Sequence, residues 1–484
     1  MPTLGAEIEK PISDIISGQT RGVSQEFFKR MAKNFSDPHI KYSDIEPQTI
    51  LGVSSPEHGS VGLDNAFNLQ ETSSKVTSNL EELHELLKTD LRLIQQTLLY
   101  EGATVINLSI HPLAKTDTQT YKAFVAPKGI YKYISQRGWD HTAGIDAKAQ
   151  NSPSTGVSPE NAAKALTTII GASAAFIGLF ANSPFAEGKI SQFKETRLNM
   201  WTRFMKNSIS EGDRTTSRFP EKPFETLAQY FYWMFGPGTN IHFVMASEGN
   251  YKTFGDGTIL IDGNPSVIDY LRKDVVKGHF FNSKKAIEVK PNLSHMEVLQ
   301  FAQFTSARIR WAFNHDNITK ETFLSALEND SLEDLFSNGG ASYMYIEGRD
   351  PGANFPDKHL QDLDENLALS TIISPSAIQS GLINNLQESN TFIRSVGWSK
   401  LNALRHSAIQ YGLDGEVEGL TVKEFASKIV EIAGKGLEAK YHPMLDYPKH
   451  VLKTDENGAD RALSDYNSGK TIQEIVISRN ADIK

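Results

Sequence analysis

Two glutamates near the amino terminus have a spacing that suits metal binding. Glu7 and Glu9 lie in the segment Leu4 to Glu9, whose alternating side chains predict a short strand followed by a turn at Pro11. Side chains two apart on a strand point to the same face, so these two carboxylates must be solvated or share a cation. Carboxylate oxygens suit Mg2+ or Mn2+, especially beside substrate phosphates. By spacing alone, ordinary surface charge on an exposed strand is the commoner explanation.

Two arginines follow a polar turn at the end of an apolar, helix-like run. The turn reads Asn182-Ser183-Pro184-Phe185, and Arg197 and Arg214 come after it. A planar guanidinium matches a carboxylate through two parallel hydrogen bonds, so this arrangement could aim cations at an anionic substrate. Taken alone, each arginine is more often a surface residue. We expect the turn itself to fix the helix end and a pocket wall rather than to take part in chemistry.

The elements that would position these residues indicate an α+β fold. Strand-like segments are scattered and hairpin-like instead of alternating regularly with helices, which favours an antiparallel sheet core flanked by helices over a doubly wound sheet. We expect one large domain over residues 1–484, with a mainly helical carboxyl-terminal part from about 385. A capping box of Ser78 and Glu81 predicts the start of a long helix. The apolar pattern predicts further helices at 24–34, at 159–180 and through most of 293–336. It predicts extended segments at 103–110, 143–157, 240–263 and 341–346.

Composition restricts the class of protein. The chain has 484 residues, of which 39% are hydrophobic and 22% charged, as in ordinary globular proteins. A net charge of −9 argues against nucleic-acid binding through a basic face. There is no cysteine, which excludes disulfides, thiolate ligands and a cysteine nucleophile. The first ten residues have no secretory pattern, and the apolar run 165–180 is short for a membrane span, so we expect a soluble cytoplasmic protein without membrane association.

Several segments, in chain order, resemble glutamate-cysteine ligases of the plant and proteobacterial type. They are the E-x-E pair after Gly5, the PKG-x-YK turn at 127–132, the ANSPF-x-EG turn at 181–188, the R-x-x-x-W step from Arg197, and the DRT step at 213–215. Related carboxylate-amine ligases share parts of the pattern, and the matches run from residue 4 to about 350 and weakly to 466. The resemblance implies a glutamine synthetase/guanido kinase-like catalytic domain.

In that family both glutamates of the E-x-E pair hold the metal ions that bridge the nucleotide phosphates, which implies this role for Glu7 and Glu9. Glu71 is the candidate third carboxylate, because it precedes a Ser/Thr-rich turn and a long amphipathic helix as in the family. The strand before Glu71 departs from the family, and Asp64 could stand in for a carboxylate there. The alternative for Glu71 is an acid that favours the start of the helix.

The resemblance also assigns anion-binding residues. It implies that Arg197, Arg214 and Arg349 face the active site and bind substrate carboxylate or phosphate, with Arg214 and Arg349 as catalytic residues and Asp213 orienting Arg214. Arg349 belongs to a late E-x-R step that begins at Glu347. Two serines, Ser152 and Ser154, occupy positions where the family has Gln and Asn directed at the nucleotide and metals; they hydrogen-bond but reach less far.

The implied reaction is the ATP- and Mg2+-dependent joining of the side-chain carboxylate of glutamate to an amine through a γ-glutamyl phosphate. Cysteine is the expected amine, which would place the enzyme in glutathione biosynthesis and produce ADP and phosphate. Two alternatives remain open: a different amine acceptor, or a non-catalytic binding or regulatory relative. Small-molecule substrates (glutamate and cysteine or another amine) are the expected partners, and the sequence leaves the oligomeric state open.

Overall fold

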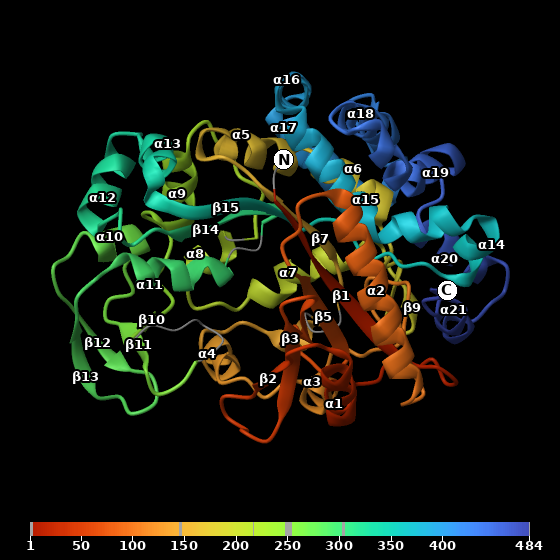
Figure 1. Cartoon of the computed structure of the whole chain (residues 1–484), viewed down its shortest axis with the longest axis horizontal. Helices are drawn as coiled ribbons and strands as arrows, with labels where there is room; N and C mark the ends of the chain where they lie inside the picture. The colour runs from red at the N-terminus through yellow and green to blue at the C-terminus, as the bar shows by residue number, and fades with distance from the viewer. Residues whose placement is uncertain (1–2, 145–147, 216, 247–253, 303–304, 484) are drawn as a thin grey trace.

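A nine-stranded sheet, antiparallel in every described pairing, runs through the centre of the molecule (Figure 1). The computed structural model describes residues 3–144, 148–215, 217–246, 254–302 and 305–483. The sheet order is β14-β15-β7-β1-β5-β4-β3-β2, with β6 also paired to β1. Its strands are β1 (Leu4–Asp14), β2 (His39–Tyr42), β3 (Ile50–Ser55), β4 (Gly59–Leu63), β5 (Leu69–Ser74), β6 (Ala103–Val105), β7 (Asn151–Gly156), β14 (Ala307–Phe313) and β15 (Ala341–Gly348).

Smaller sheets lie outside this one. A four-stranded antiparallel sheet contains β10 (Val244–Met245), β11 (Thr258–Ile261), β12 (Val276–Phe280) and β13 (Ala286–Val289). Two short hairpins are formed by β8 (Phe185–Ala186) with β9 (Lys189–Ile190) and by β16 (Glu416–Val417) with β17 (Leu420–Thr421). These sheets and the helices between them confirm the predicted α+β class with an antiparallel core.

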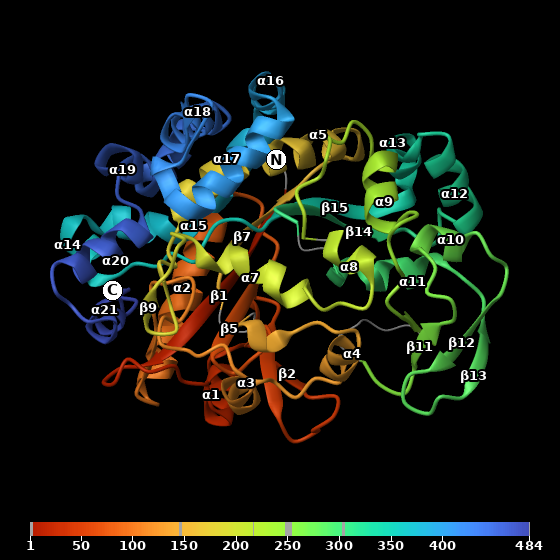
Figure 2. The same ribbon diagram turned by 180° about the vertical axis from the view of Figure 1, so that it is seen from behind.

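Helices cover both faces of the central sheet. In Figure 1, α2 and α15 lie in front of β1 and β7, whereas α7 lies in front of the sheet in the reverse view of Figure 2. The helices of the amino-terminal half are α1 (Gln25–Asn34), α2 (Leu80–Leu99), α3 (Thr118–Phe124), α4 (Ile130–Gln136), α5 (Pro159–Gly171), α6 (Ser173–Phe180), α7 (Thr196–Met205), α8 (Glu211–Thr215) and α9 (Leu227–Phe235). Those that follow are α10 (Val267–Leu271), α11 (Leu293–Val298), α12 (Lys320–Glu328), α13 (Leu332–Leu335), α14 (Lys358–Leu363), α15 (Glu365–Asn384), α16 (Leu386–Val396), α17 (Trp398–Tyr411), α18 (Val422–Lys435), α19 (Asp446–Thr454), α20 (Gly458–Asn467) and α21 (Ile472–Ser478).

Strand β1 is longer than its sequence pattern predicts. The expected turn at Pro11 is wrong, because the strand continues to Asp14. Proline is tolerated here because it lies between the part of β1 that pairs with β7, up to Ile8, and the part that pairs with β6, from Ile12. Its missing N–H therefore falls where β1 changes partners on that side.

Helix boundaries also depart from the sequence pattern. The helix α2 is capped by Asn79, whose side chain accepts from the backbone N–H of Glu82, so the predicted cap was one residue early. The predicted helix over 159–180 is two helices, α5 and α6, bent by 46°. No single helix among the described residues is long and apolar enough to cross a membrane; α5 and α6 reach that length and apolar composition only when the bent pair is taken together.

The segment 293–336 contains a strand that the predicted helical pattern missed. Residues 307–313 form β14, in which Ile309, Trp311 and Phe313 are buried at the two-residue period of a strand. Helix 24–34 and strand 341–346 are confirmed as α1 and β15, and extended structure within 143–157 and 240–263 is confirmed as β7, β10 and β11. Parts of these predictions, at 145–147, 247–253 and 303–304, lie outside the described residues.

A buried carboxylate ties the last helices to the rest of the fold. Asp357 caps α14 and is 0% exposed. Its Oδ2 lies 3.2 Å from Arg461 Nη1 and 3.5 Å from Arg479 Nη1, and it accepts a 2.7 Å hydrogen bond from Asn107. Burial alone would raise the pKa of Asp357, but the two arginines hold it below its ordinary value. The charged carboxylate therefore stabilises the packing of α20 and α21.

We expect Asp357→Asn to lower the free energy of unfolding by about 3–5 kcal/mol, because it leaves the buried guanidinium of Arg461 without a counter-charge and that of Arg479 with Asp465 alone. Chemical denaturation followed by circular dichroism measures this change. The matched control is Asp362→Asn, which removes an exposed carboxylate from its pair with Lys358 and should leave the denaturation midpoint nearly unchanged. Equal effects of the two substitutions would contradict the role assigned to Asp357.

Candidate active site

The register of the central strands gathers the predicted carboxylates on one face of the sheet. Glu9 on β1 is directly opposite Glu71 on β5, and Glu7 is directly opposite Ser152 on β7. Directly opposed residues of antiparallel strands project to the same face. This face is therefore acidic at β1 and β5, as the spacing of Glu7 and Glu9 predicts.

The same face becomes basic toward the β14 edge. Ser154 on β7 is opposite Glu347 on β15, and Glu347 is opposite Arg308 on β14. Glu347 pairs with Arg308 at 2.7 Å, Arg349 at 3.0 Å and Arg310 at 3.5 Å. Although burial would raise the pKa of Glu347, the three arginines hold it at about 2. One ionised carboxylate among three guanidinium groups leaves a local excess of positive charge.

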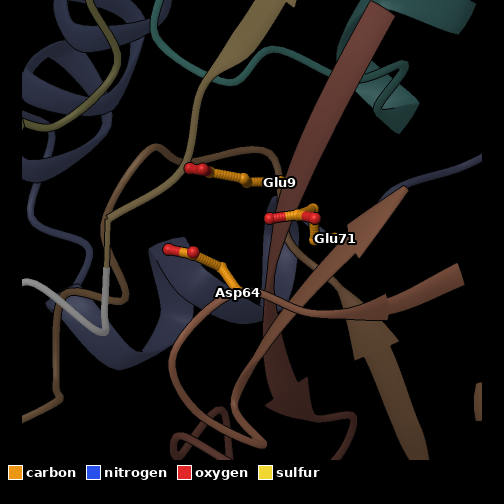
Figure 3. Close-up of side chains that lie close together, drawn as sticks. All are labelled: Glu9, Asp64 and Glu71. Carbon is orange, nitrogen blue, oxygen red and sulfur yellow. The ribbon is translucent and has the colours of Figure 1, made fainter. Parts of the chain in front are cut away.

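Three carboxylates converge closely enough to share a cation. Glu9, Asp64 and Glu71 each offer an oxygen, and these oxygens lie within 4.8 Å of one another (Figure 3). Figure 3 shows Glu9 and Asp64 extending to the same side of the strands. Glu7 is outside this group of three but lines the same cavity and accepts a 3.3 Å hydrogen bond from Ser73. Asp64, which the sequence offered only as a substitute, thus lies with Glu9 and Glu71.

The PKG-x-YK segment holds the turn that carries Asp64. Lys128 Nζ donates to the backbone carbonyl of Asp64 and, at 3.1 Å, to that of Leu63. Tyr131 donates its hydroxyl to the side-chain oxygen of Asn65 at 3.1 Å. A segment distant in sequence therefore fixes the β4–β5 turn, which explains why a motif without catalytic side chains lies next to the site.

The environment of Glu9 fits a divalent cation. Its side chain is 3% exposed, and Oε2 is buried without a hydrogen-bond partner among the described residues. Burial raises the pKa of Glu9 to about 7; Lys148 opposes this shift, whereas Asp64 and Glu7 add to it. Burying charge without compensation is costly, and a hard cation with oxygen ligands would relieve that cost.

Lys148 is a site residue that the sequence analysis missed. It is 2% exposed, lines the same cavity as Glu9, and places its Nζ 4.5 Å from the ring centroid of Trp201. Burial lowers the pKa of Lys148, while Glu9 and Asp64 act in the opposite direction. A lone lysine in a loop carries no motif, so only the fold reveals it as the counter-charge of the carboxylates.

Two cavities adjoin at this face. The first, about 320 Å³, is lined by the carboxylates, Lys148, Arg308 and Arg349, with apolar walls from β3, β4 and α4. The second, about 700 Å³, is lined from α7, α17 and the segments near 214–219 and 305–306. Trp201 and Arg349 line both cavities. Chemistry that uses both spaces would therefore take place beside these two side chains.

Arg197 does not line either cavity, which corrects its predicted contact with substrate. It is 0% exposed, and its Nε donates to Glu195 at 2.7 Å. Its terminal nitrogens donate to the side chain of Gln150 at 3.2 Å, the carbonyl of Arg349 at 3.3 Å and the carbonyl of Asp350 at 2.6 Å. Because protein acceptors engage each of its nitrogens, Arg197 positions the 349–350 turn instead of binding ligand.

Arg214 and Asp213 have separate environments. Arg214 is exposed, lines the second cavity and donates to the carbonyl of Ser208 at 3.0 Å. Asp213 is buried and accepts from Arg137 at 2.6 and 2.7 Å and from the indole of Trp139 at 2.8 Å. The prediction that Asp213 orients Arg214 is therefore replaced by a role for Asp213 in joining α8 to the residues after α4.

The two serines lie on the expected face without lining either cavity. Ser152 is 0% exposed and its Oγ has no hydrogen-bond partner among the described residues, whereas Ser154 is half-buried. The Asn182 turn follows the end of α6, but none of residues 182–185 lines either cavity, so the expected pocket wall is not observed there. The side chain of Asn182 donates to Asn107 at 3.0 Å and to the carbonyl of Ala353 at 2.8 Å.

Comparison with known proteins supports the family resemblance. Residues 4–234 match the model of glutamate-cysteine ligase family 2 (GCS2), which confirms the resemblance seen in the motifs over that part of the chain. A search of curated protein sequences finds no match.

Three solved structures are similar to this chain. The glutamate–cysteine ligase of Francisella tularensis in complex with AMP is 11% identical, with a TM-score of 0.49; the match covers 99% of this chain and 87% of the ligase chain. A bifunctional glutathione synthetase from Pasteurella multocida is 11% identical, with a TM-score of 0.45; the match covers 98% of this chain and 51% of the synthetase chain. A chain in the complex of the prokaryotic ubiquitin-like protein Pup with its ligase PafA is 9% identical, with a TM-score of 0.38; the match covers 100% of this chain and 74% of that chain.

We expect Glu9→Gln to raise the melting temperature of the metal-free protein at pH 8 and to remove most of its stabilisation by Mg2+. In the folded protein the pKa of Glu9 is raised from 4.5 to about 7. The stability that its protonated form contributes is therefore present below pH 4.5 and is lost as pH rises through about 7. Glutamine keeps the neutral form at every pH but is a poorer cation ligand.

Thermal melts at pH 5 and pH 8, with EDTA or with Mg2+, measure both effects. The matched control is Glu57→Gln, an exposed glutamate outside the first cavity, which should melt like the parent protein in all four conditions. Unchanged Mg2+ stabilisation in Glu9→Gln would exclude Glu9 as a metal ligand.

Proposed function

We propose that this protein is an ATP-dependent carboxylate–amine ligase that activates the side-chain carboxylate of glutamate as an acyl phosphate and joins it to an amine. The observation that carries the proposal is the convergence of Glu9, Asp64 and Glu71 in a cavity that also contains Arg308 and Arg349. This convergence lies largely within the segment that matches glutamate-cysteine ligase family 2.

The residues fit the electrostatic demands of this reaction. A carboxylate must be activated before an amine can displace its oxygen, because hydroxide is a poor leaving group. Transfer of a phosphoryl group from ATP to a carboxylate brings anions together, and cations must neutralise the charge in the transition state. A divalent cation held by Glu9, Asp64 and Glu71, with Glu7 nearby, would neutralise nucleotide phosphates and orient them.

Arginines would act from the opposite side of the transferred group. Arg308 and Arg349 both line the first cavity, and their shared partner Glu347 holds them there. Arg349 also lines the second cavity, so its guanidinium lies where a phosphoryl group in one space meets a carboxylate in the other. This position supports Arg349 as a catalytic residue and favours the second cavity for the amino-acid substrates.

Trapping with hydroxylamine tests the function without knowledge of the natural amine. The enzyme, ATP, Mg2+ and glutamate should give γ-glutamyl hydroxamate and ADP, because hydroxylamine attacks an activated carboxylate. With glutamate labelled by 18O in its side-chain carboxylate, the label should appear in released phosphate. Label in AMP would overturn phosphorylation in favour of adenylation, and no nucleotide turnover would favour a non-catalytic binding role.

We expect Arg214→Lys to reduce kcat/KM for glutamate by about ten- to hundredfold, the effect of losing one bidentate, charge-assisted contact with a carboxylate. Lysine keeps the charge but cannot form the planar fork. Initial rates of hydroxamate formation with varied glutamate and varied ATP measure the change. The control is Arg203→Lys on α7, which lies outside the second cavity. Unchanged kinetics for both substrates would leave Arg214 with a structural role only.

A further inference from the structure

We propose that the amine acceptor is a small amino acid or peptide with at least two carboxylates, bound in the second cavity. This inference rests on the function proposed above and names the class of its second substrate. It depends on the charges that line the cavity and on two lining residues whose buried acceptor atoms have no donor among the described residues.

The second cavity contains more cations than its own residues neutralise. Its lining includes Lys206, Arg214 and Arg218, none of which forms an ion pair with a carboxylate in the described part of the chain. Two further guanidinium groups, those of Arg349 and Arg405, do have carboxylate partners. All three side chains are exposed, so water and not a protein carboxylate surrounds their charges, and a ligand in the cavity can pair with them.

A monocarboxylate acceptor would leave part of this charge without a partner. Once the side-chain carboxylate of glutamate is phosphorylated, the donor retains one carboxylate, and an acceptor such as cysteine brings one more. These two anions match two of the three cations. A second carboxylate on the acceptor would match the third, and arginine suits such a contact because its fork fits a carboxylate.

The cavity also offers acceptors for amino groups. Asp350 is 3% exposed, and its Oδ1 has no hydrogen-bond partner among the described residues; the nearest cation is Arg405 Nη2, at 3.7 Å. The Oδ1 atom of Asn402 on α17 is likewise buried without a partner in the part of the chain that the structure describes. Both residues line the cavity. Buried oxygens without donors are costly, so a side-chain rotation that brings either oxygen to an amino group of donor or acceptor would be favourable.

The size of the cavity permits two substrates of this kind. A volume of about 700 Å³ lies within the range of sites that bind drug-sized ligands and exceeds the need of a single amino acid. Because Trp201 and Arg349 line both cavities, the donor's activated carboxylate belongs at that boundary. Lys206 and Arg218, from the end of α7 and the segment after α8, would then contact the acceptor.

Matched acceptors test the inference. Aspartate is compared with asparagine, and 2-aminoadipate with norleucine, since the members of each pair differ in the second carboxylate; cysteine is included as the monocarboxylate expected from the family. Mass spectrometry measures the γ-glutamyl products, and hydroxylamine trapping measures activation in parallel. We expect kcat/KM to be at least about tenfold higher for the dicarboxylate of each pair and higher than for cysteine.

The outcomes separate this inference from the proposed function. Hydroxamate formation with no preference for the dicarboxylates, with cysteine preferred, or with no coupling to any of these acceptors would overturn the inference and leave the ligase function standing. Absence of hydroxamate would overturn the function and this inference with it.

Variants of the two cations locate the preference. We expect Lys206→Gln and Arg218→Gln each to reduce the ratio of kcat/KM for the dicarboxylate to that for its neutral partner by about tenfold. Using the ratio cancels a general loss of activity or of folded protein. The control is Arg203→Gln on α7, the helix that ends just before Lys206. This control should retain the ratio. An unchanged ratio in both cavity variants would exclude these cations as contacts of the acceptor.

Discussion

The crowding of carboxylates around the buried Glu9 is the constraint on which the site depends. Glu9 and Glu71 face each other across a strand pair, and Asp64 approaches from the neighbouring turn. Like charges directly opposite each other destabilise a sheet, so this arrangement persists only because the surrounding fold determines it. Strand β1 pairs with β5 on one side and with β7 and β6 on the other, so a shift of its register would break hydrogen bonds on both sides.

A layer of buried polar contacts transmits this constraint to the second cavity. Glu195 accepts from Arg197, Arg197 donates to Gln150, and Gln150 donates to Glu9 at 3.4 Å. Arg197 also binds the carbonyls of the 349–350 turn, which carries a guanidinium and a carboxylate into the second cavity. The positions of the acidic group and the basic cavity are therefore coupled through one buried arginine, even though that arginine contacts neither space.

The sequence predicted the parts of the site that lie on regular strands. The two-residue spacing of Glu7 and Glu9 follows directly from strand geometry, and Glu347 and Arg349 could be placed because they end a clear strand. Arg308 was missed because the helical patterns on both sides of β14 were extended across it, although its arginines alternate with apolar residues as in a half-buried strand. The position of Lys148 in the site and the exposure of Arg214 depend on long-range packing, which no local pattern encodes.

The buried position of Arg197 also depends on long-range packing. A family motif marks Arg197 as important, but it does not show whether the side chain binds ligand or instead positions another residue that does.

A difference in charge between the two cavities that meet at Arg349 gives the site a direction. The first cavity combines four carboxylates with five lysine or arginine side chains, which suits a divalent cation together with nucleotide phosphates. The second is lined by five such cations and one carboxylate, that of Asp350, which suits substrate carboxylates. A phosphoryl group passing from nucleotide to carboxylate would therefore move toward the more basic cavity and would gain electrostatic stabilisation as it does. Trp201 lies against Lys148 and lines both cavities, so with Arg349 it marks the boundary between them. Lys148 and the arginines of the first cavity balance its carboxylates, whereas the cations of the second cavity have one carboxylate among them and retain charge for ligands.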